Sequence, residues 1–407
     1  MNQASSPAGK WRTLALLSVA ELLGMSVWFS ASSVIPLLVS QWHLSGSDQA
    51  WLTMSVQVGF VVGTLLSSVF NLADLLPAHA LFAASSILAS VVTAAIPAFA
   101  NDVTLALPLR FFTGLFLAGV YPVGMKIMAT WTREDRGLGI GLLVGALTVG
   151  SAAPHFLSAL MGNLEEWRHV LYLSGALALA GGFIAARYVR EGPFRTPLPK
   201  FNWKYSLQIL GRKELALANL GYLGHMWELY AMWAWVPIFL VSSFQLRQVD
   251  SRWASGASFV VIAAGGVGSV LAGSLADRIG RTTVTIASMA ISGSCAFVAG
   301  LLYGASPIAV TALCIVWGFA VVADSAQFSA CISELAQPEY IGTALTLQTS
   351  LGFLLTLAPI RLIPWLVLRV GWEWAFAFLS IGPAIGVWAM KSLRKSPEAG
   401  KLAGGNR

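Results

Sequence analysis

Long apolar segments fill almost the whole chain, and they constrain its fold more than any other feature. A helix that crosses the hydrocarbon core of a bilayer needs about 20 mostly apolar residues. Twelve segments of the 407-residue chain have close to that length or more, and short polar gaps separate them. They are residues 13–40, 50–72, 79–97, 105–130, 138–161, 170–188, 214–243, 254–275, 283–303, 307–333, 342–366 and 372–390. We therefore predict an all-α membrane protein with twelve transmembrane helices.

The small share of charged residues indicates a bilayer rather than water as the solvent of this chain. Only 11% of the residues are charged and 57% are hydrophobic, whereas soluble proteins carry about 25% charged residues. The net charge of +7 lies in short polar gaps and in the two tails. It does not form the aromatic-interleaved basic face that is typical of nucleic-acid binding. We therefore expect a lipid bilayer, and no nucleic acid, among the partners.

The placement of basic residues also predicts the orientation. If the N-terminus is cytoplasmic, 18 of the 25 Lys and Arg residues fall in inside segments and 4 in outside segments. Positively charged loops favour the cytoplasmic side, so we predict a multi-pass protein of the plasma (inner) membrane with both termini in the cytoplasm. The apolar segment at residues 13–40 is too long for the core of a signal peptide, and we interpret it as a retained first span.

Four short motifs of the first half recur about two hundred residues later, in the same order. The pairs are IPLLVSQW at 35–42 with VPIFLVSSF at 236–244, DQAW at 48–51 with DSRW at 250–253, NLAD at 71–74 with SLAD at 274–277, and EDRG at 134–137 with EYIG at 339–342. Repeats in register indicate a duplication. We predict two pseudo-symmetric six-helix bundles, residues 1–188 and 214–407, joined by a basic, proline-rich cytoplasmic linker at residues 189–213. The second bundle ends in a short cytoplasmic tail.

Two motifs give the chain a family resemblance. The loop GSLADRIGR has the spacing Gly-x-x-x-Asp-Arg-x-Gly-Arg, and the fourth span contains LPLRFFTGLFLAG, with Arg110 and Gly114. With these motifs the chain resembles the major facilitator superfamily of secondary transporters. The resemblance implies a substrate site between the halves near mid-membrane, lined by spans one, four, seven and ten. The fifth span lacks the adjacent Gly-Pro of the antiporter pattern, which makes a drug exporter a weaker expectation.

The same resemblance implies a cytoplasmic gate. In it, Asp277 would lie near the start of span five, around Gly137, and the loop arginines would pair with Glu134 or Asp135. The first copy of the loop has Asp74 but no arginine, and by the same resemblance Asp74 would lie near the start of span eleven. We therefore expect an asymmetric gate. Its residues are Asp74, Gly273, Asp277, Arg278, Gly280 and Arg281.

Ionisable residues inside a membrane are candidates for function because they are costly to bury. In the first half, Glu21 is either a proton carrier or the fixed ion-pair partner of Arg110. Arg110 stays protonated, so it can hold a substrate carboxylate or act on Glu21, but it cannot carry the coupled proton. Trp28 and Tyr121 lie on the same spans and are candidates for the substrate cavity.

The second half carries a more polar seventh span, GHMWELYAMWAW. His225 and Glu228 are one helical turn apart, so they form either a proton relay or a hydrogen-bonded pair that stabilises packing. Two such groups are too few for a metal site, and we expect no metal and no cofactor. Further candidates for the substrate cavity are Trp227 and Trp235 in span seven and Asp324 and Gln327 in span ten.

Together these features predict a secondary transporter that works by alternating access. We expect it to be proton-coupled, monomeric and specific for a small organic anion, with Glu21, Arg110, Glu228 and His225 in proton coupling. A proton-coupled exporter of lipophilic drugs or cations is the first alternative, and a membrane receptor that transports nothing is the second. The string GLGIG at residues 137–141 follows no strand, so it does not indicate a dinucleotide site, and we expect no enzyme activity.

Overall fold

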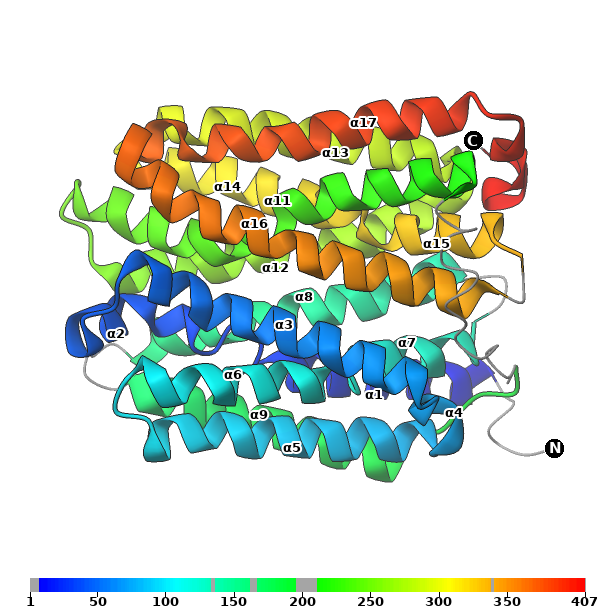
Figure 1. The fold of residues 1–407 in the computed structure, drawn as a ribbon, viewed down its shortest axis with the longest axis horizontal. Helices are drawn as coiled ribbons and strands as arrows, with labels where there is room; N and C mark the ends of the chain where they lie inside the picture. The colour runs from blue at the N-terminus through cyan, green and yellow to red at the C-terminus, as the bar shows by residue number, and fades with distance from the viewer. Residues whose placement is uncertain (1–6, 133–135, 162–166, 195–210, 338–339, 407) are drawn as a thin grey trace. The chain divides into compact units, whose positions relative to one another are not determined.

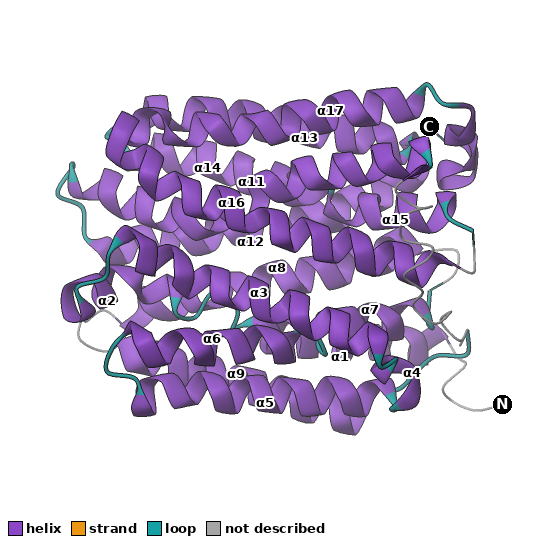
Figure 2. Cartoon of the chain, viewed as in Figure 1, coloured by secondary structure: helices purple, strands orange, loops and turns teal. Residues whose placement is uncertain are grey.

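The computed structural model describes residues 7–132, 136–161, 167–194, 211–337 and 340–406, and the regular structure in these ranges is helical (Figures 1 and 2). The all-helical prediction is therefore confirmed. The chain divides into two compact units, Met1–Leu198 and Pro199–Arg407. Most of the linker predicted at residues 189–213 lies outside the described residues.

The first unit contains the helices of the first six predicted spans. They are α1 (Pro7–Met25), α2 (Ile35–Trp42), α3 (Gly46–Val69), α4 (Leu72–Leu75), α5 (Ala78–Phe99), α6 (Val103–Leu117), α7 (Tyr121–Ala129), α8 (Arg136–Met161) and α9 (Trp167–Tyr188). Helix α3 packs on α6, α5 packs on α9, and α1 packs on both α8 and α9.

The second unit repeats this arrangement. Its helices are α11 (Lys213–Gln245), α12 (Ser251–Ile279), α13 (Arg281–Ala299), α14 (Pro307–Ala323), α15 (Ser325–Leu335), α16 (Ile341–Ala375) and α17 (Ile381–Arg394), followed by the 3₁₀ segment η6 (Pro397–Gly405). Helix α12 packs on α14, and α13 packs on α17. These pairs join spans eight with ten and nine with twelve, as α3–α6 and α5–α9 join spans two with four and three with six.

Length and hydropathy identify nine membrane-spanning stretches among the described residues. One of them, Ile341–Arg394, is long enough to hold two spans and covers predicted spans eleven and twelve. A kink at Gly371, with φ of 71°, separates these two spans. A positive φ is accessible to glycine at little cost, so the turn does not require a polar interruption of the apolar sequence.

Three spans that the sequence predicts as continuous are interrupted. Span one leaves α1 at Met25, passes through turns at residues 26–31 and resumes as α2. Span four is interrupted between α6 and α7, and span ten at Asp324, between α14 and α15. Hydropathy misses these interruptions because most of the residues that form them are apolar or small, and the single charged residue, Asp324, lies between two long apolar segments.

Two helix crossings rely on glycine. A Cβ atom placed on Gly114 of α6 would lie 2.0 Å from the carbonyl oxygen of Val56 in α3. A Cβ on Gly318 of α14 would lie 1.9 Å from the carbonyl oxygen of Val261 in α12. Small residues let membrane helices approach closely, so the crossing α3–α6 and its repeat α12–α14 both depend on the absence of a side chain.

Candidate functional site

Five of the buried ionisable residues lie on predicted cavity-lining spans, two in the first unit and three in the second. Glu21 and Arg110 are fully buried in the first unit, and His225, Glu228 and Asp324 are almost fully buried in the second. All five lie on predicted spans one, four, seven and ten. We describe each cluster within its own unit.

Arg110 of α6 stabilises the interruption in span one. Its Nη1 donates to the carbonyl oxygen of Val27 at 2.9 Å, its Nη2 donates to that of Trp28, and its Nε donates to that of Leu52 at 3.2 Å. Nη1 also lies 3.3 Å from Ser30 Oγ. Backbone groups freed by a broken helix must find partners inside a bilayer. The guanidinium group supplies these partners, which explains why an arginine is buried here.

Serine hydroxyls complete the same interruption. Ser26 donates to the carbonyl oxygen of Leu23 at 2.7 Å and to that of Ser174 in α9 at 2.9 Å. Ser30 donates to the carbonyl oxygen of Val27 at 2.9 Å. The broken segment is therefore held by the packed helices of its own unit rather than left as a loose loop.

The carboxyl group of Glu21 lies in apolar surroundings. Oε2 is 2.7 Å from where a Cβ of Gly124 in α7 would lie, and the Leu143 and Phe82 side chains border the same space. In the described part of the chain, neither Glu21 oxygen has a hydrogen-bond partner. The expected pairing with Arg110 is not found there. A buried carboxylate without partners is costly, so this environment favours the neutral, protonated form of Glu21.

The two aromatic candidates of the first unit lie close to these groups. The Trp28 ring makes an edge contact with Phe60, with 5.1 Å between centroids, and its backbone carbonyl accepts from Arg110. Tyr121 is the first residue of α7 and lies within electrostatic reach of the Glu21 carboxyl group. The interrupted span four thus brings Arg110 and Tyr121 to the same part of span one.

In the second unit the acidic groups have partners. His225 Nδ1 lies 2.8 Å from Asp324 Oδ1. Glu228 accepts a hydrogen bond of 2.8 Å from Ser292 Oγ and one of 2.7 Å from Trp317 Nε1. Glu228 and Asp324 are also within electrostatic reach of each other. Three titratable groups of spans seven and ten therefore share one buried volume.

Aromatic rings surround this second cluster. The His225 ring lies 6.1 Å from Tyr222 and 5.5 Å from Phe328, measured between centroids. Trp235 Nε1 donates to the Ile360 carbonyl oxygen of α16 at 3.0 Å. The His225 Nε2 atom is buried and has no hydrogen-bond partner among the described residues. His225 thus contacts Asp324 through Nδ1, while Nε2 remains available to a polar ligand.

Trp227 lies apart from the other candidates. It is half-buried, and its indole Nε1 donates to the carbonyl oxygen of Phe378 at 3.2 Å, while its Cβ approaches Gly382. These residues belong to the segment that begins span twelve. Within the second unit, the structure thus places Trp227 on the side of α11 that packs on α17.

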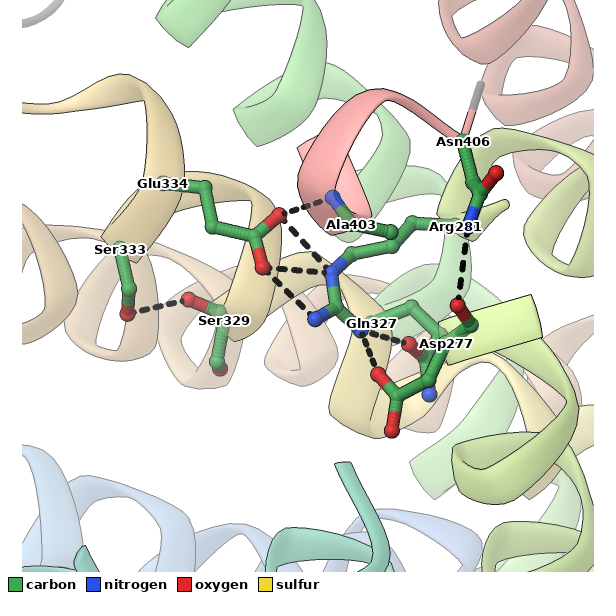
Figure 3. Close-up of polar contacts among 8 residues, drawn as sticks. All are labelled: Asp277, Arg281, Gln327, Ser329, Ser333, Glu334, Ala403 and Asn406. Carbon is green, nitrogen blue, oxygen red and sulfur yellow. Dashed lines mark hydrogen bonds and ion pairs between the residues drawn. The ribbon is translucent and has the colours of Figure 1, made fainter. Parts of the chain in front are cut away.

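Gln327 connects the buried cluster with the loop signature (Figure 3). Its backbone amide donates to the Asp324 carbonyl oxygen at 2.9 Å, and its Oε1 accepts from Arg281 Nη1 at 2.9 Å. Arg281 in turn binds Glu334 through Nε, at 2.9 and 3.0 Å, and through Nη2, at 2.6 Å. Arg281 Nη1 also lies 3.3 Å from Asp277 Oδ1.

The remaining signature residues shape the turn. Gly280 separates α12 from α13 with φ of 99°, a conformation that favours glycine. Gly273 is buried on α12, and Arg278 is exposed. The expected partners Glu134 and Asp135 lie outside the described residues. Sequence reasoning missed Glu334, although it is the acidic residue at the same end of span ten as the Asp277 loop.

The chain's C-terminal segment is bound to this signature cluster (Figure 3). The Ala403 amide donates to Glu334 Oε2 at 3.0 Å, and Asn406 Nδ2 donates to the Asp277 carbonyl oxygen at 3.1 Å. Leu402 of η6 is fully buried, and Glu398 forms an ion pair of 2.8 Å with Arg212. The segment expected as a short tail is thus packed on the second unit.

The first copy of the loop uses a lysine instead. Lys126 of α7 binds both the carboxylate of Asp74 and the carbonyl oxygen of Ala73. Asp74 lies in the short helix α4, which follows Asn71 in the left-handed conformation, with φ of 53°. The first loop therefore has a cation after all, but it comes from span four rather than from the loop.

The family of the chain follows from its sequence profile. The profile of the Major Facilitator Superfamily matches residues 17–359 and, in an overlapping match, residues 220–407. The chain belongs to the major facilitator superfamily. This is a family of transporters rather than of enzymes, and the resemblance noted from the two motifs is confirmed.

Solved structures show the same fold. The chain is similar to a nucleoside transporter, with a TM-score of 0.70 and 14% identity over 94% of this chain and 100% of that one. It is also similar to a proton:xylose symporter, with a TM-score of 0.69 and 14% identity over 95% and 96% of the two chains. The predicted architecture of two six-helix bundles is thereby confirmed.

Curated relatives match more locally. The chain is 31% identical to the niacin transporter of Acinetobacter baylyi over 170 residues, 39% of this chain and 35% of the relative. It is 22% identical to a probable sulfoacetate transporter of Cupriavidus necator over 74% of each chain. It is 26% identical to the 4-hydroxybenzoate transporter of Pseudomonas aeruginosa over 42% and 38%. The chain thus spans about a third of the length of the niacin transporter.

Proposed function

We propose that this protein transports a small organic anion together with protons, by alternating access. The observation that carries the proposal is the buried charge of the first unit. Arg110 binds carbonyl oxygens and a hydroxyl group, and no carboxylate among the described residues neutralises it. Its positive charge therefore remains available to stabilise an anion in a medium of low dielectric.

The protonation state of Glu21 would change the net charge of the first unit. When Glu21 is ionised, it offsets the charge of Arg110, and the pair is neutral as a whole. When Glu21 is protonated, the first unit has a net positive charge that favours an anionic substrate. Proton binding at Glu21 and anion binding near Arg110 are then linked, because each favours the other. This linkage is the physical basis of the proposed coupling.

The relatives support the substrate class. Their names refer to niacin, sulfoacetate and 4-hydroxybenzoate, which are small molecules that carry a carboxylate, a sulfonate or both at neutral pH. Trp28 and Tyr121 provide aromatic surface beside Arg110. We propose an aromatic or short-chain carboxylate as the substrate, with Arg110 acting through its charge rather than through free donors.

The second unit provides further proton sites. The contact of His225 with Asp324 and the two hydrogen bonds to Glu228 hold these groups in one buried volume. Gln327 links that volume to Arg281, Glu334 and Asp277. We propose that this chain of contacts lets the cytoplasmic gate of the second half respond to protonation of the buried cluster. We also propose that both termini lie in the cytoplasm and that the protein acts as a monomer.

The test is flux in liposomes with niacin and 4-hydroxybenzoate as probe anions. We expect Glu21→Gln to retain anion exchange, because a neutral amide resembles the protonated carboxyl group, and to lose anion-driven proton flux. Glu228→Gln should also reduce proton flux. The matched control is Glu373→Gln, the same change at an exposed residue, which should leave both activities intact. Full proton flux with Glu21→Gln would refute the coupling.

A proton-coupled exporter of lipophilic cations is the second candidate, and one observation favours it. Glu228 and Asp324 are two buried carboxyl groups, and the rings of Tyr222, Phe328 and Trp317 lie beside them. Aromatic faces attract cations. If lipophilic cations stabilise the purified protein against heat and neither probe anion does, the anion proposal is wrong and this candidate takes its place.

A further inference from the structure

A basic groove lies at one end of the second unit, outside the buried clusters. Its volume is about 600 Å³, and Ile286 of α13 lines it together with Lys391, Arg394 and Lys395. None of these four residues is acidic. We call this feature the basic groove.

The orientation of Arg394 is fixed from one side. Its Nη1 donates to Thr283 Oγ1 of α13 at 2.9 Å. This bond carries the guanidinium group from α17 across to the neighbouring helix, while its other N–H groups remain as donors. A fork of donors held in place by one bond is suited to a tetrahedral anion, because arginine binds phosphate oxygens in pairs.

The helix faces that lead away from the basic groove are apolar and exposed. One turn from Lys391 on α17 lies Trp388, with 60% of its surface exposed, and Ile385 follows with 43%. On α13, Ile291 is 48% exposed. In a membrane protein such residues face lipid, and tryptophan anchors helices at the level of the headgroups. The cations therefore lie where a lipid headgroup begins.

We propose that the basic groove binds the phosphate headgroup of an anionic phospholipid, with an acyl chain along Ile286 and the exposed face of α17. The three cations favour a phosphate group, which could belong to a lipid headgroup or to inorganic phosphate. The apolar wall favours the lipid, because inorganic phosphate makes no use of Ile286 or Trp388. Basic pockets between transmembrane helices bind anionic headgroups in this way.

The duplication offers a matched control. Arg187 lies in the last turn of α9, which corresponds to α17, and Arg190 follows just after its end; the two are separated by the same three positions as Lys391 and Arg394. Arg190, however, donates to the carbonyl oxygens of Ala186 and Val189, at 3.0 and 2.6 Å. The first unit therefore has two of the three cations, and among the described residues Arg190 donates within its own segment rather than to a neighbouring helix.

The experiment measures lipid binding to the purified full-length chain by native mass spectrometry. The probes are phosphatidylglycerol, phosphatidylcholine and inorganic phosphate. We expect phosphatidylglycerol to bind more tightly than phosphatidylcholine. The double variant Lys391→Gln/Arg394→Gln should lower the affinity for phosphatidylglycerol by about tenfold or more. The double variant Arg187→Gln/Arg190→Gln should change this affinity by less than about twofold.

Two further variants separate loss of the site from loss of folding. Ile286→Glu adds an acid to the wall of the basic groove without removing a cation, so it should also weaken the binding of phosphatidylglycerol. Arg394→Lys keeps the charge and should retain most of the binding. Equal binding of phosphatidylcholine, or an equal loss in the Arg187/Arg190 control, overturns the proposal. Inorganic phosphate that competes with the lipid at similar concentration overturns the lipid as the occupant.

Discussion

The two halves of this transporter keep their buried charge in different ways. In the first half, span one is interrupted, and Arg110 binds the carbonyl oxygens that the interruption frees. In the second half, span seven is described as one continuous helix, α11, although Pro237 lies within it. At the shift that aligns Gly114 with Gly318, Arg110 corresponds to Cys314, which is buried. In the first half, the buried Arg110 thus lies where the backbone of span one is broken.

The two copies of the loop also differ in where their cation comes from. Asp74 takes its cation, Lys126, from span four. Asp277 lies beside Arg281 of its own loop, and Arg281 is bound mainly by Glu334 of span ten. Both copies therefore join the loop after their second span to their fourth span, but the acid and the base have exchanged places. The contact between loop and span is common to both copies, while the residues that make it are not.

The largest expected effect is at Arg110. Arg110→Met removes a donor from each of three carbonyl oxygens. The Val27 oxygen keeps the Ser30 hydroxyl group as a donor, but a buried group that loses its partner costs about 1–3 kcal/mol. We expect a loss of more than about 3 kcal/mol in stability, measured by thermal unfolding in detergent. Glu228→Gln is the matched change in the second half and should cost less than about 1 kcal/mol, because an amide can still pair with Ser292 and Trp317. Equal losses would remove the contrast between the halves.

The helix crossings should respond alike in both halves. Gly114→Ala and Gly318→Ala each push a methyl group against a backbone carbonyl oxygen at about the same separation. Overpacking of this kind costs about 1–3 kcal/mol, so both variants should lower the unfolding temperature by similar amounts. Gly400→Ala is the control, because no atom lies within 4 Å of the position of its Cβ. A large effect in one half alone would contradict the structural repeat.

The loop contacts should contribute different amounts of stability to the two halves. Glu334→Gln weakens three hydrogen bonds to Arg281 and frees the Ala403 amide, whereas Asp74→Asn weakens one bond to Lys126. We expect about 1–3 kcal/mol of destabilisation for the first change and less than about 1 kcal/mol for the second. In a cysteine-accessibility assay, Asp277→Asn should favour the inward-open state more than Asp74→Asn. Equal accessibility changes would count against an asymmetric gate.

A modest effect is expected for the C-terminal segment. A chain that ends after Ser396 loses the buried Leu402 side chain and the Ala403 hydrogen bond to Glu334. Because both groups are at the edge of the unit, we expect a loss of only about 1–2 kcal/mol. Transport by the truncated protein at low temperature should remain. An unchanged unfolding temperature would show that this segment does not stabilise the second half.

The sequence predicted the fold well because bilayer thickness makes each span visible as a run of apolar residues. The duplicated motifs likewise predicted two halves of like architecture. The depth of Glu21, Arg110, His225, Glu228 and Asp324 was also predictable, since each lies well inside such a run. Their partners were not. Glu334 is 53 residues from Arg281, and Ser292 is 64 residues from Glu228, and single-sequence patterns carry no information on contacts so distant.

By itself, the sequence determined that this chain crosses a membrane many times, that it is duplicated, and which spans carry buried charge. Hydropathy and repeated motifs are local properties, so they can be read without coordinates. Only the tertiary structure decided that span one breaks, that Arg110 binds the freed carbonyl oxygens, and that Glu21 is left beside Gly124 without Arg110 as its partner. The reason is that hydrogen bonds inside a bilayer are satisfied between helices, and helix packing decides which groups meet.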